Sequence, residues 1–334
     1  MTAASLIRRR LGRTGLEVTP LCIGTSPLAS MANLYGYGVD HERAVATISA
    51  AFRSPINFID TSNGYGEDGT AERRIGDAIR RAGGLPADVV LATKVDPDPK
   101  TGVFSGDRVR ASFEESMNRL GLDRVPLLHL HDPERISLAE GLGPGGPVEA
   151  LVDLRNRGLV DHLGVAGGPV DILAAYLDTG EFEVLLSHNR YTLLDRSAEA
   201  LFESAMARGI AVLNAAPYGG GMLTRWPVDR SRYAYGQGAA PLIDAANEMG
   251  RLCADAGVPF AAAALQFSTR DPRITSTIVG MRTVGDLEAS IELDEIEIPE
   301  ELWAALLAVP LDPSTWQDAG RSEGEPSLEV PEQP

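Results

Sequence analysis

Four ionisable side chains stand at positions from which they could move a proton together. Asp60, Lys94 and His131 end the apolar runs INFID, LATK and LLHLH, and Tyr65 lies in a glycine-rich stretch five residues after Asp60. A tyrosine holds its proton with an ordinary pKa of about 10, and a nearby lysine ammonium is expected to lower that pKa. Asp60 would hold the lysine, and His131 would orient a substrate oxygen or relay its proton. The set predicts proton transfer at an oxygen while hydride moves at the attached carbon.

Eight short apolar runs are spaced along the chain and predict the strands that would position these side chains. They cover residues 20–25, 56–61, 88–95, 125–132, 161–167, 182–189, 209–217 and 275–281. Amphipathic helical patterns lie between them, at 41–53, 70–82, 106–121, 147–158, 197–209 and 240–257. Strands that are apolar throughout and alternate with helices are typical of a covered parallel sheet. The sequence therefore predicts an α/β protein with a (β/α)8 TIM barrel, whose active site lies at the carboxyl ends of the strands.

The two ends of the chain predict smaller features. Two short strands around Gly12 to Gly15 predict an N-terminal β-hairpin that caps the bottom of the barrel. One domain is expected over residues 1–319, and the Glu/Pro/Ser-rich residues 320–334 are expected to form a disordered acidic tail. A G-x-G-x-x-G string at residues 141–146 would favour a dinucleotide-binding Rossmann domain. It contains a proline and follows no strand, so residues 141–147 are interpreted as a flexible loop.

The composition disfavours nucleic acids and membranes as partners. Lys and Arg number 30 and Asp and Glu number 47, so the formal net charge is −17, which disfavours nucleic acid and anionic membranes. No apolar run approaches the roughly 18 residues of a membrane span, and the first residues lack the apolar core of a signal peptide. A cytoplasmic protein is expected, with Cys22 and Cys253 as buried free thiols. The expected partner is a small molecule, and the oligomeric state is left open, a homo-oligomer included.

Several ordered motifs carry a resemblance to a known family. They are LGRTGLEVTPLCIGT, FIDTSNGYG, LATKV, LLHLHDPE, NRYTLLDR and STIVGMRT. Over almost its whole length the chain resembles the aldo-keto reductases, which implies a catalytic tetrad of Asp60, Tyr65, Lys94 and His131 beneath a nicotinamide dinucleotide. The strings DTSNGYG and NRYTLLDR are most similar to the aldose 1-dehydrogenase branch, such as the L-fucose and D-threo-aldose dehydrogenases. This implies oxidation of an aldose at C1 to a lactone. The alternative is a general aldehyde or ketone reductase, or a pyridoxal-type enzyme, of the same family.

The resemblance also implies which residues contact the ligands. Ala166-Gly167 stands where the family has a Ser-Asn pair that holds the carboxamide, and Ala215 stands where an aromatic residue stacks on the nicotinamide. Tyr218, three residues later, is the alternative stacking residue. The cofactor-binding candidates are Ala166, Gly167, Ala215, Pro217, Tyr218, Gly219, Gly220, Gly221, Leu223, Gly280, Met281, Arg282, Asp286 and Ser290. The substrate-binding candidates are Asp132, which replaces a tryptophan common in the family, His188 and Asn189.

The segment after the last strand carries a prediction of cofactor choice. NADP-dependent relatives grip the 2′-phosphate with a lysine, a serine and an arginine, at positions that are Gly280, Met281 and Asp286 here. An aspartate repels a phosphate but accepts hydrogen bonds from the free ribose hydroxyls of NAD. Arg282 could reach a 2′-phosphate instead, and it is interpreted as a surface arginine paired with Asp286. NAD is therefore expected to be preferred over NADP.

Two other classes of function compete with this interpretation. His129 and His131 form an H-x-H, and with His162 and His188 it is typical of metal-dependent barrel hydrolases. Such an enzyme would need an aspartate at the end of the last strand, where Gly280 stands, so no metal is predicted. A non-catalytic dinucleotide-binding regulatory subunit is the other alternative, and the complete tetrad argues against it.

Overall fold

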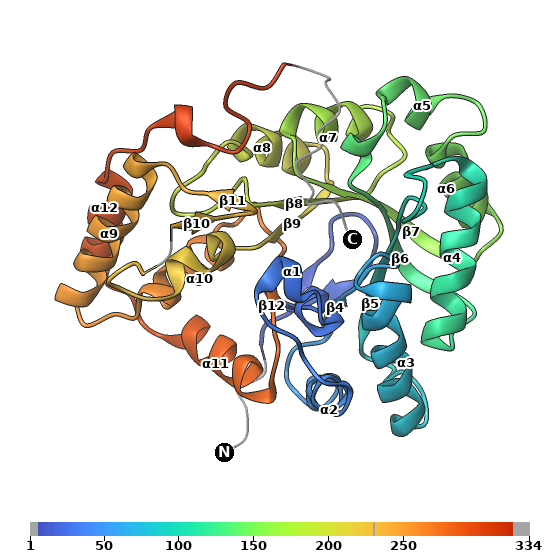
Figure 1. The fold of residues 1–334 in the computed structure, drawn as a ribbon, viewed down its shortest axis with the longest axis horizontal. Coiled ribbons are helices and arrows are strands. Elements are labelled where there is room, and N and C mark those ends of the chain that lie inside the picture. The colour runs from blue at the N-terminus through green and yellow to red at the C-terminus, as the bar shows by residue number, and fades with distance from the viewer. Residues whose placement is uncertain (1–5, 230, 323–334) are drawn as a thin grey trace.

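Eight parallel strands close into a barrel in the computed structural model, which describes residues 6–229 and 231–322. The strands follow one another around the barrel in chain order, and the last pairs with the first (Figure 1). They are β3 (Leu21–Gly24), β4 (Phe58–Asp60), β5 (Val90–Val95), β6 (Val125–His131), β7 (Val160–Gly167), β8 (Val184–His188), β9 (Ala211–Ala215) and β12 (Ser276–Gly280). Every predicted strand is present, and the predicted TIM barrel is confirmed.

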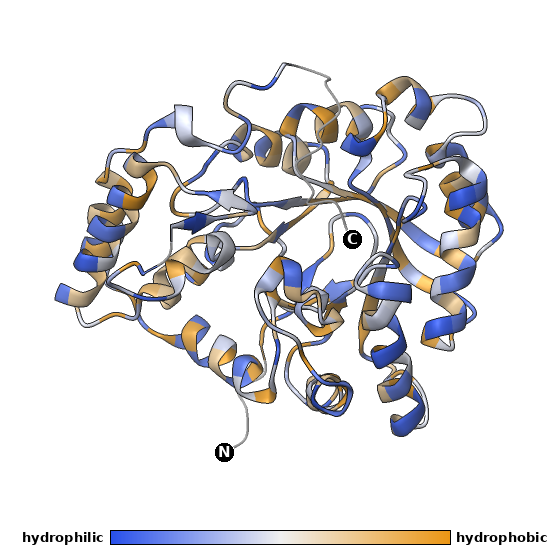
Figure 2. Ribbon diagram, in the orientation of Figure 1, coloured by the Kyte–Doolittle hydropathy of each residue, from blue (hydrophilic) through white to orange (hydrophobic). Residues whose placement is uncertain are grey.

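Helices surround the barrel and bury one face each against the strands. The longer ones are α2 (His41–Ala51), α3 (Thr70–Ala82), α4 (Gly106–Leu120), α6 (Pro147–Asn156), α7 (Val170–Leu177), α8 (Glu199–Ala207), α9 (Ala240–Asp255), α10 (Phe260–Thr269), α11 (Val284–Glu295) and α12 (Glu300–Ala308). Figure 2 shows hydrophobic and hydrophilic residues side by side along these helices, as an amphipathic helix requires. Local signals fix their ends: the Asp40 side chain accepts from the amide of Arg43 at the start of α2, and Gly121 ends α4 with φ 72°.

The bottom of the barrel is closed by the predicted hairpin. Strands β1 (Arg9–Arg10) and β2 (Glu17–Val18) pair antiparallel. Leu11 and Val18 are fully buried and pack in one cluster with inward-facing residues of the barrel strands, such as Leu127 and Leu213. Because the hairpin and these apolar side chains fill the lower half, ligands can enter only at the opposite mouth.

Several elements were not predicted from the sequence. Helices α7, α10, α11 and α12 were missed, as were the short helices α1 (Ala32–Tyr35) and α5 (Leu138–Leu142). A second small hairpin, β10 (Arg232–Tyr233) and β11 (Gly236–Gln237), is also present. The interpretation of residues 141–147 as a flexible loop is wrong at both ends. Residues 141 and 142 belong to α5, whose first turn has a capping box formed by Ser137 and Glu140, and Pro147 begins α6.

The remaining expectations about the chain have mixed outcomes. Cys22 and Cys253 are buried and free, as predicted. Among the described residues, every helix is too short or too polar to cross a bilayer. Most of the predicted tail, residues 323–334, lies outside the described residues, and a single domain over 1–319 stays a prediction.

Candidate active site

The mouth of the barrel holds a buried lysine that links an aspartate to a tyrosine. The Nζ atom of Lys94 lies 2.6 Å from Oδ2 of Asp60, 2.8 Å from the carbonyl oxygen of Thr61 and 3.1 Å from the phenol oxygen of Tyr65. The side chains of Lys94 and Asp60 are 1% and 3% exposed. A buried ammonium is costly unless it is paired and hydrogen-bonded. Here all three donor positions are used, and the tyrosine oxygen is fixed beside a cation.

His131 completes the group from the next strand. Its ring meets the ring of Tyr65 edge to face, with centroids 5.6 Å apart. Its Nδ1 atom lies 2.6 Å from Oδ1 of Asp96 and 3.0 Å from the hydroxyl of Ser62. The structure therefore brings together all four residues that the sequence singled out, and it adds two that the sequence analysis missed. Lys94 and Asp96 are two residues apart, so the alternation of side chains along a strand could have indicated Asp96.

The expected lowering of the tyrosine pKa is wrong for the protein alone. Burial raises the pKa of Tyr65 well above its ordinary value, and the carboxylate of Asp60 raises it further. The reason is that Asp60 offsets the charge of Lys94, so the ammonium does not act on the phenol as an isolated cation. At neutral pH Tyr65 keeps its proton, and Lys94 donates a hydrogen bond to its oxygen.

A polar rim lies beside the tetrad, and Asp132 is at its centre. The Oδ1 atom of Asp132 is 3.6 Å from Nε2 of His131 and 3.7 Å from Nε2 of His188, and Arg135 donates to Oδ2 at 3.3 Å. Burial opposes ionisation of Asp132, but the two histidines and Arg135 outweigh it and hold the pKa of this carboxyl below its usual range. Burial and the nearby Asp132 raise the pKa of Glu134 to about 7. At neutral pH the rim thus offers both an ionised carboxyl group, Asp132, and a partly protonated one, Glu134.

Backbone strain is concentrated at the same mouth. Asp132, Asn189 and Ala216 follow strands β6, β8 and β9, and their φ angles of 44°, 60° and 60° lie in the left-handed region that non-glycine residues rarely adopt. Strained residues of this kind persist where the surrounding structure holds them, often at functional sites. The strain turns the chain sharply at the strand ends, where the rim side chains gather.

The predicted substrate-binding residues form only part of a continuous polar surface at the mouth. His188 contacts the ring of Tyr235 edge to face at 5.7 Å, and Tyr235 comes from the unpredicted β10–β11 hairpin. Asn189 is buried, and its Oδ1 has no hydrogen-bond partner within the described chain. Arg190, next in sequence, instead donates twice to Oδ1 of Asp318 in the C-terminal segment. The polar run therefore turns away from the mouth after Asn189.

Unsatisfied polar groups lie in the mouth where the sequence predicts the nicotinamide end of a dinucleotide. Ala166 and Gly167, at the end of β7, are buried and offer no polar side-chain atom. On the neighbouring strand, the hydroxyl of Ser187 and Oδ1 of Asn189 are buried without partners inside the described structure. Buried polar atoms normally have partners, so a ligand amide fits these two positions. Ser187 was not among the predicted cofactor residues. It lies on the strand next to Ala166-Gly167, the positions of the family's Ser-Asn pair, and this neighbourhood is not visible in the sequence.

The loop after β9 supplies the next group of predicted cofactor residues. Ala215 and Pro217 precede Tyr218, which packs partly against the main hydrophobic core. Gly219, Gly220 and Gly221 follow with φ angles of 54°, 68° and 97°. A Cβ atom at Gly219 would lie 2.4 Å from the ring of Tyr233, and one at Gly220 would lie 2.6 Å from the carbonyl oxygen of Ala234, so glycine is required at both positions. Leu223 is fully buried. The glycines thus place backbone, rather than side chains, along this part of the rim.

The adenine end of the predicted site lies at the start of α11. Gly280 is exposed at the end of β12, whereas Met281 is fully buried in the core and can offer only its backbone. Arg282 pairs with Asp286, with Nε and Nη2 at 2.9 and 3.2 Å from its two carboxylate oxygens, as predicted. Ser290 donates its hydroxyl to the carbonyl oxygen of Asp286 one turn along the helix. The carboxylate is held at the surface by an arginine that it neutralises.

Three potential metal ligands lie together at one place in the described structure, but two of them, Asp132 and His188, already pair with one another. The ligand atoms of Asp132, Glu134 and His188 lie within 4.8 Å of one another. This group differs from the H-x-H set considered from the sequence. His162 pairs with Glu183 at 2.9 Å near the start of β7, at the end of the barrel opposite the mouth. The four histidines therefore do not converge on one site.

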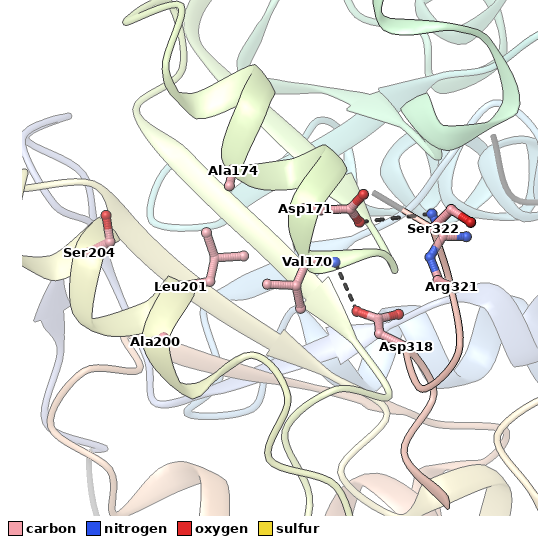
Figure 3. Close-up of a pocket in the computed structure, with 9 residues that line it drawn as sticks. All are labelled: Val170, Asp171, Ala174, Ala200, Leu201, Ser204, Asp318, Arg321 and Ser322. Atoms are coloured by element: carbon pink, nitrogen blue, oxygen red, sulfur yellow. Dashed lines mark hydrogen bonds and ion pairs between the residues drawn. The ribbon is translucent and has the colours of Figure 1, made fainter. Parts of the chain in front are cut away.

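A separate hollow of about 430 Å³ lies outside the barrel mouth. It is lined by residues of α7 and α8 and of the C-terminal segment, and Figure 3 shows the amide of Val170 bonded to Asp318 at its edge. No member of the tetrad lines it. The hollow is formed where the C-terminal segment crosses the two helices.

Comparison with known proteins gives one consistent match. The model of the Aldo/keto reductase family matches residues 20–309. L-galactose dehydrogenase from Arabidopsis thaliana is 33% identical, over 92% of this chain and 96% of that protein. Pyridoxal 4-dehydrogenase from Microbacterium luteolum and D-threo-aldose 1-dehydrogenase from a Pseudomonas species are 30% and 31% identical, each over 90% of this chain and 96% of the relative. The fold also matches a holo aldo-keto reductase from Bacillus halodurans, with a TM-score of 0.73 at 21% identity, over 95% of this chain and all of that one.

Proposed function

Since the chain belongs to the aldo/keto reductase family and is an NAD(P)-dependent oxidoreductase, we propose that it oxidises an aldose at C1 to a lactone. The observation that carries the proposal is the buried contact of Lys94 with both Asp60 and Tyr65. This contact places an acid–base oxygen beside a fixed cation. Asp60, Tyr65, Lys94 and His131 are the proposed catalytic tetrad.

The residues divide the work of this reaction. The Tyr65 phenolate takes the proton of the C1 hydroxyl, and Lys94 stabilises the phenolate while it is charged. His131 donates from Nε2 to the same substrate oxygen and holds it near Tyr65. The C1–H and O–H bonds break as the C1=O bond of the lactone forms. A bound nicotinamide dinucleotide supplies the acceptor of the hydride that leaves C1.

The rim supports a sugar as the substrate class. We propose that the other hydroxyl groups of the sugar contact Asp132, His188 and Asn189, since a carboxylate and an imidazole form hydrogen bonds with hydroxyl groups and not with apolar chains. Two of the relatives are named for sugars, L-galactose and D-threo-aldose. A third is named for pyridoxal, and this is the second candidate.

The proposed cofactor is NAD rather than NADP. Asp286 stands at the ribose end of the predicted site, and its pairing with Arg282 occupies the nearest guanidinium. An NADP 2′-phosphate would have to break this pair and approach a carboxylate. We expect a preference for NAD of about 1–2 kcal/mol, roughly ten- to thirtyfold in kcat/KM.

A substrate panel tests the function directly. Aldoses, including L-galactose and L-fucose, are compared with pyridoxal and simple aldehydes, each with both nicotinamide cofactors, by the absorbance of the reduced nicotinamide. We expect aldose oxidation, faster at alkaline pH, because burial raises the pKa of Tyr65 and its phenolate forms only there. Activity confined to apolar aldehydes would return the chain to the general reductases of the family.

A matched pair of variants tests the role of the phenol. Tyr65→Phe should lower kcat by several orders of magnitude while the affinity for NADH is retained, because only the hydroxyl is lost. Tyr176→Phe removes another buried phenol, on α7 away from the tetrad, and should keep the wild-type rate. A Tyr65→Phe rate above about a tenth of wild type would mean that another group moves the proton.

A further inference from the structure

The residues behind His131 form a second hydrogen-bond network, beside that of Lys94, and the family assignment does not explain it. Asp96 directly follows β5, and it is buried. One of its carboxylate oxygens, Oδ2, accepts from the hydroxyl of Ser62 and, at 2.8 Å, from the amide of Gly64. Its other oxygen, Oδ1, lies 2.6 Å from Nδ1 of His131. Its own amide donates to the hydroxyl of Ser112, so both its backbone and its side chain are fixed.

The directions of these hydrogen bonds assign the proton on Nδ1. The Ser62 hydroxyl gives its single hydrogen to Asp96, so toward His131, 3.0 Å away, it can only accept. Burial opposes the ionisation of Asp96, but His131, Ser62 and Gly64 outweigh it and lower the pKa of this carboxyl, so it too can only accept. Both neighbours of Nδ1 are acceptors. Nδ1 therefore carries a hydrogen, shared between Asp96 and Ser62.

The other ring nitrogen faces a second carboxylate. Nε2 of His131 lies 3.6 Å from Oδ1 of Asp132. A neutral ring with its hydrogen on Nδ1 would turn a lone pair toward this oxygen, whereas a protonated Nε2 is attracted to it. The arrangement thus favours the imidazolium, with one carboxylate at each nitrogen.

The charged and titratable groups around the ring act in both directions. From β5, Lys94 opposes a charge on His131, and Tyr65 contacts the ring from the loop after β4. Asp60 on β4 favours the charge. Two further imidazoles are close: His188 on β8 shares Asp132 with His131, and His129 lies on β6 itself.

The two flanking carboxylates decide the outcome. Burial by itself would lower the pKa of His131, but Asp132 and Asp96 outweigh burial and raise it. This direction agrees with the hydrogen-bond geometry at both nitrogens.

We propose that Asp96 is a positioning residue: with Ser62 it holds Nδ1–H of His131, so that the ring is doubly protonated and presents Nε2–H to the substrate oxygen. This role rests on the proposed function of His131. It predicts that the fixed ring donates to the oxygen at C1 throughout the reaction, while Tyr65 alone exchanges the proton. Asp96 acts only through His131, since its two carboxylate oxygens are turned to the ring and to the loop after β4.

Nitrogen NMR of the imidazoles tests the proposal without any substrate. The chain has five histidines, and the spectrum of His131→Gln identifies the signals of His131. In the wild-type protein at neutral pH, both nitrogens of His131 should be protonated. In Asp96→Asn its pKa should fall by about one unit or more, because the nearest opposite charge is lost. A wild-type spectrum with Nδ1 unprotonated would overturn the proposal even if no variant folds.

Kinetics then separate positioning from a structural role. Asp96→Asn should lower kcat about ten- to hundredfold, leave the Kd for NADH unchanged, and shift the pH profile of kcat. Ser62→Ala keeps the carboxylate, so it should lower kcat less than about fivefold and leave His131 charged at neutral pH. A shifted imidazole signal with no turnover of any sugar would contradict the proposed function but not the network. Full turnover in Asp96→Asn, or an unmoved His131 signal, would refute the role of Asp96.

Discussion

Replacing Asp60 by asparagine would leave a buried cation without its counter-ion. Asp60→Asn keeps the size of the side chain and one oxygen that can accept from Lys94, so it removes the charge alone. The ammonium remains 1% exposed, and its other contacts are the neutral oxygens of Thr61 and Tyr65. We therefore expect a large loss of stability from a single-atom change.

The size of the loss follows from the burial of the pair. Breaking a buried ion pair by removing one partner costs about 3–5 kcal/mol, and the retained hydrogen bond puts Asp60→Asn near 3 kcal/mol. Lys94→Met leaves the carboxylate unpaired and should cost about the same. In the double variant no uncompensated charge remains, so its cost should also be about 3 kcal/mol rather than the sum of about 6. The coupling energy is then about 3 kcal/mol.

Urea unfolding of the four proteins, followed by tryptophan fluorescence, measures this coupling. The exposed pair of Arg251 and Asp255 gives a matched control, since its side chains are 45% and 64% exposed. The cycle of Arg251→Met and Asp255→Asn should give less than about 0.5 kcal/mol. The double variant at Asp60 and Lys94 should stay inactive although it is about as stable as either single variant. Additive losses at Asp60 and Lys94, within about 0.5 kcal/mol, would refute the inference that their charges depend on each other.

Two further predictions concern the adenine end and the rim. Asp286→Arg should shift the ratio of kcat/KM toward NADP at least tenfold, whereas Arg282→Ala should leave the efficiency with NADP almost unchanged. A marked loss of efficiency with NADP in Arg282→Ala would show that Arg282 grips the 2′-phosphate. Glu134→Gln should gain stability relative to wild type as pH rises from about 5 to 8. The folded pKa of Glu134 is about 7, against an ordinary value of 4.5, so the wild-type protein loses the favourable neutral form of Glu134 through this pH range. The gain should reach about 3 kcal/mol, and an unchanged pH dependence of urea unfolding would contradict it.

The barrel and its tetrad could be predicted because their signals are local. Each barrel strand is a short apolar run, and Asp60, Lys94 and His131 stand at or near the carboxyl ends of three consecutive runs. Parallel strands that pair in chain order bring these ends together at one mouth. The hairpin at the bottom was predictable for the same reason, since its strands surround a glycine turn.

The missed features depend on contacts between distant segments. Asp96 lies two residues after Lys94, but its role is visible only once Ser62 and His131 are placed beside it. Tyr235 reaches His188 from a hairpin whose strands have two residues each, too short for a periodic pattern. Helices α7 and α10 have hydrophobic residues around most of their surface, so they lack the amphipathic pattern by which α3 was found.

The pKa of Tyr65 shows why residue types alone were insufficient. A lysine beside a tyrosine lowers the pKa of the phenol when the lysine charge is uncompensated, and here Asp60 compensates it at 2.6 Å. The same pair is what allows Lys94 to be buried at all. The sequence predicted the right residues but the wrong direction for the pKa shift of Tyr65. That direction depends on the distances between the phenol and the two charges, and on burial, which only the structure shows.

Because three carboxylates lie at the mouth of the barrel, the protonation state of His131 decides the net charge of the mouth. Asp60, Asp96 and Asp132 follow or end three consecutive strands, and each has a cationic neighbour: Lys94 for the first, His131 for the second, and both His131 and Arg135 for the third. With His131 protonated, these three carboxylates face three cationic groups, and Glu134 adds a carboxyl group that is partly ionised at neutral pH. With His131 neutral, the mouth keeps an excess negative charge that would repel the phosphates of a dinucleotide. Holding His131 as an imidazolium therefore serves both the reacting oxygen and the binding of an anionic cofactor to an acidic protein.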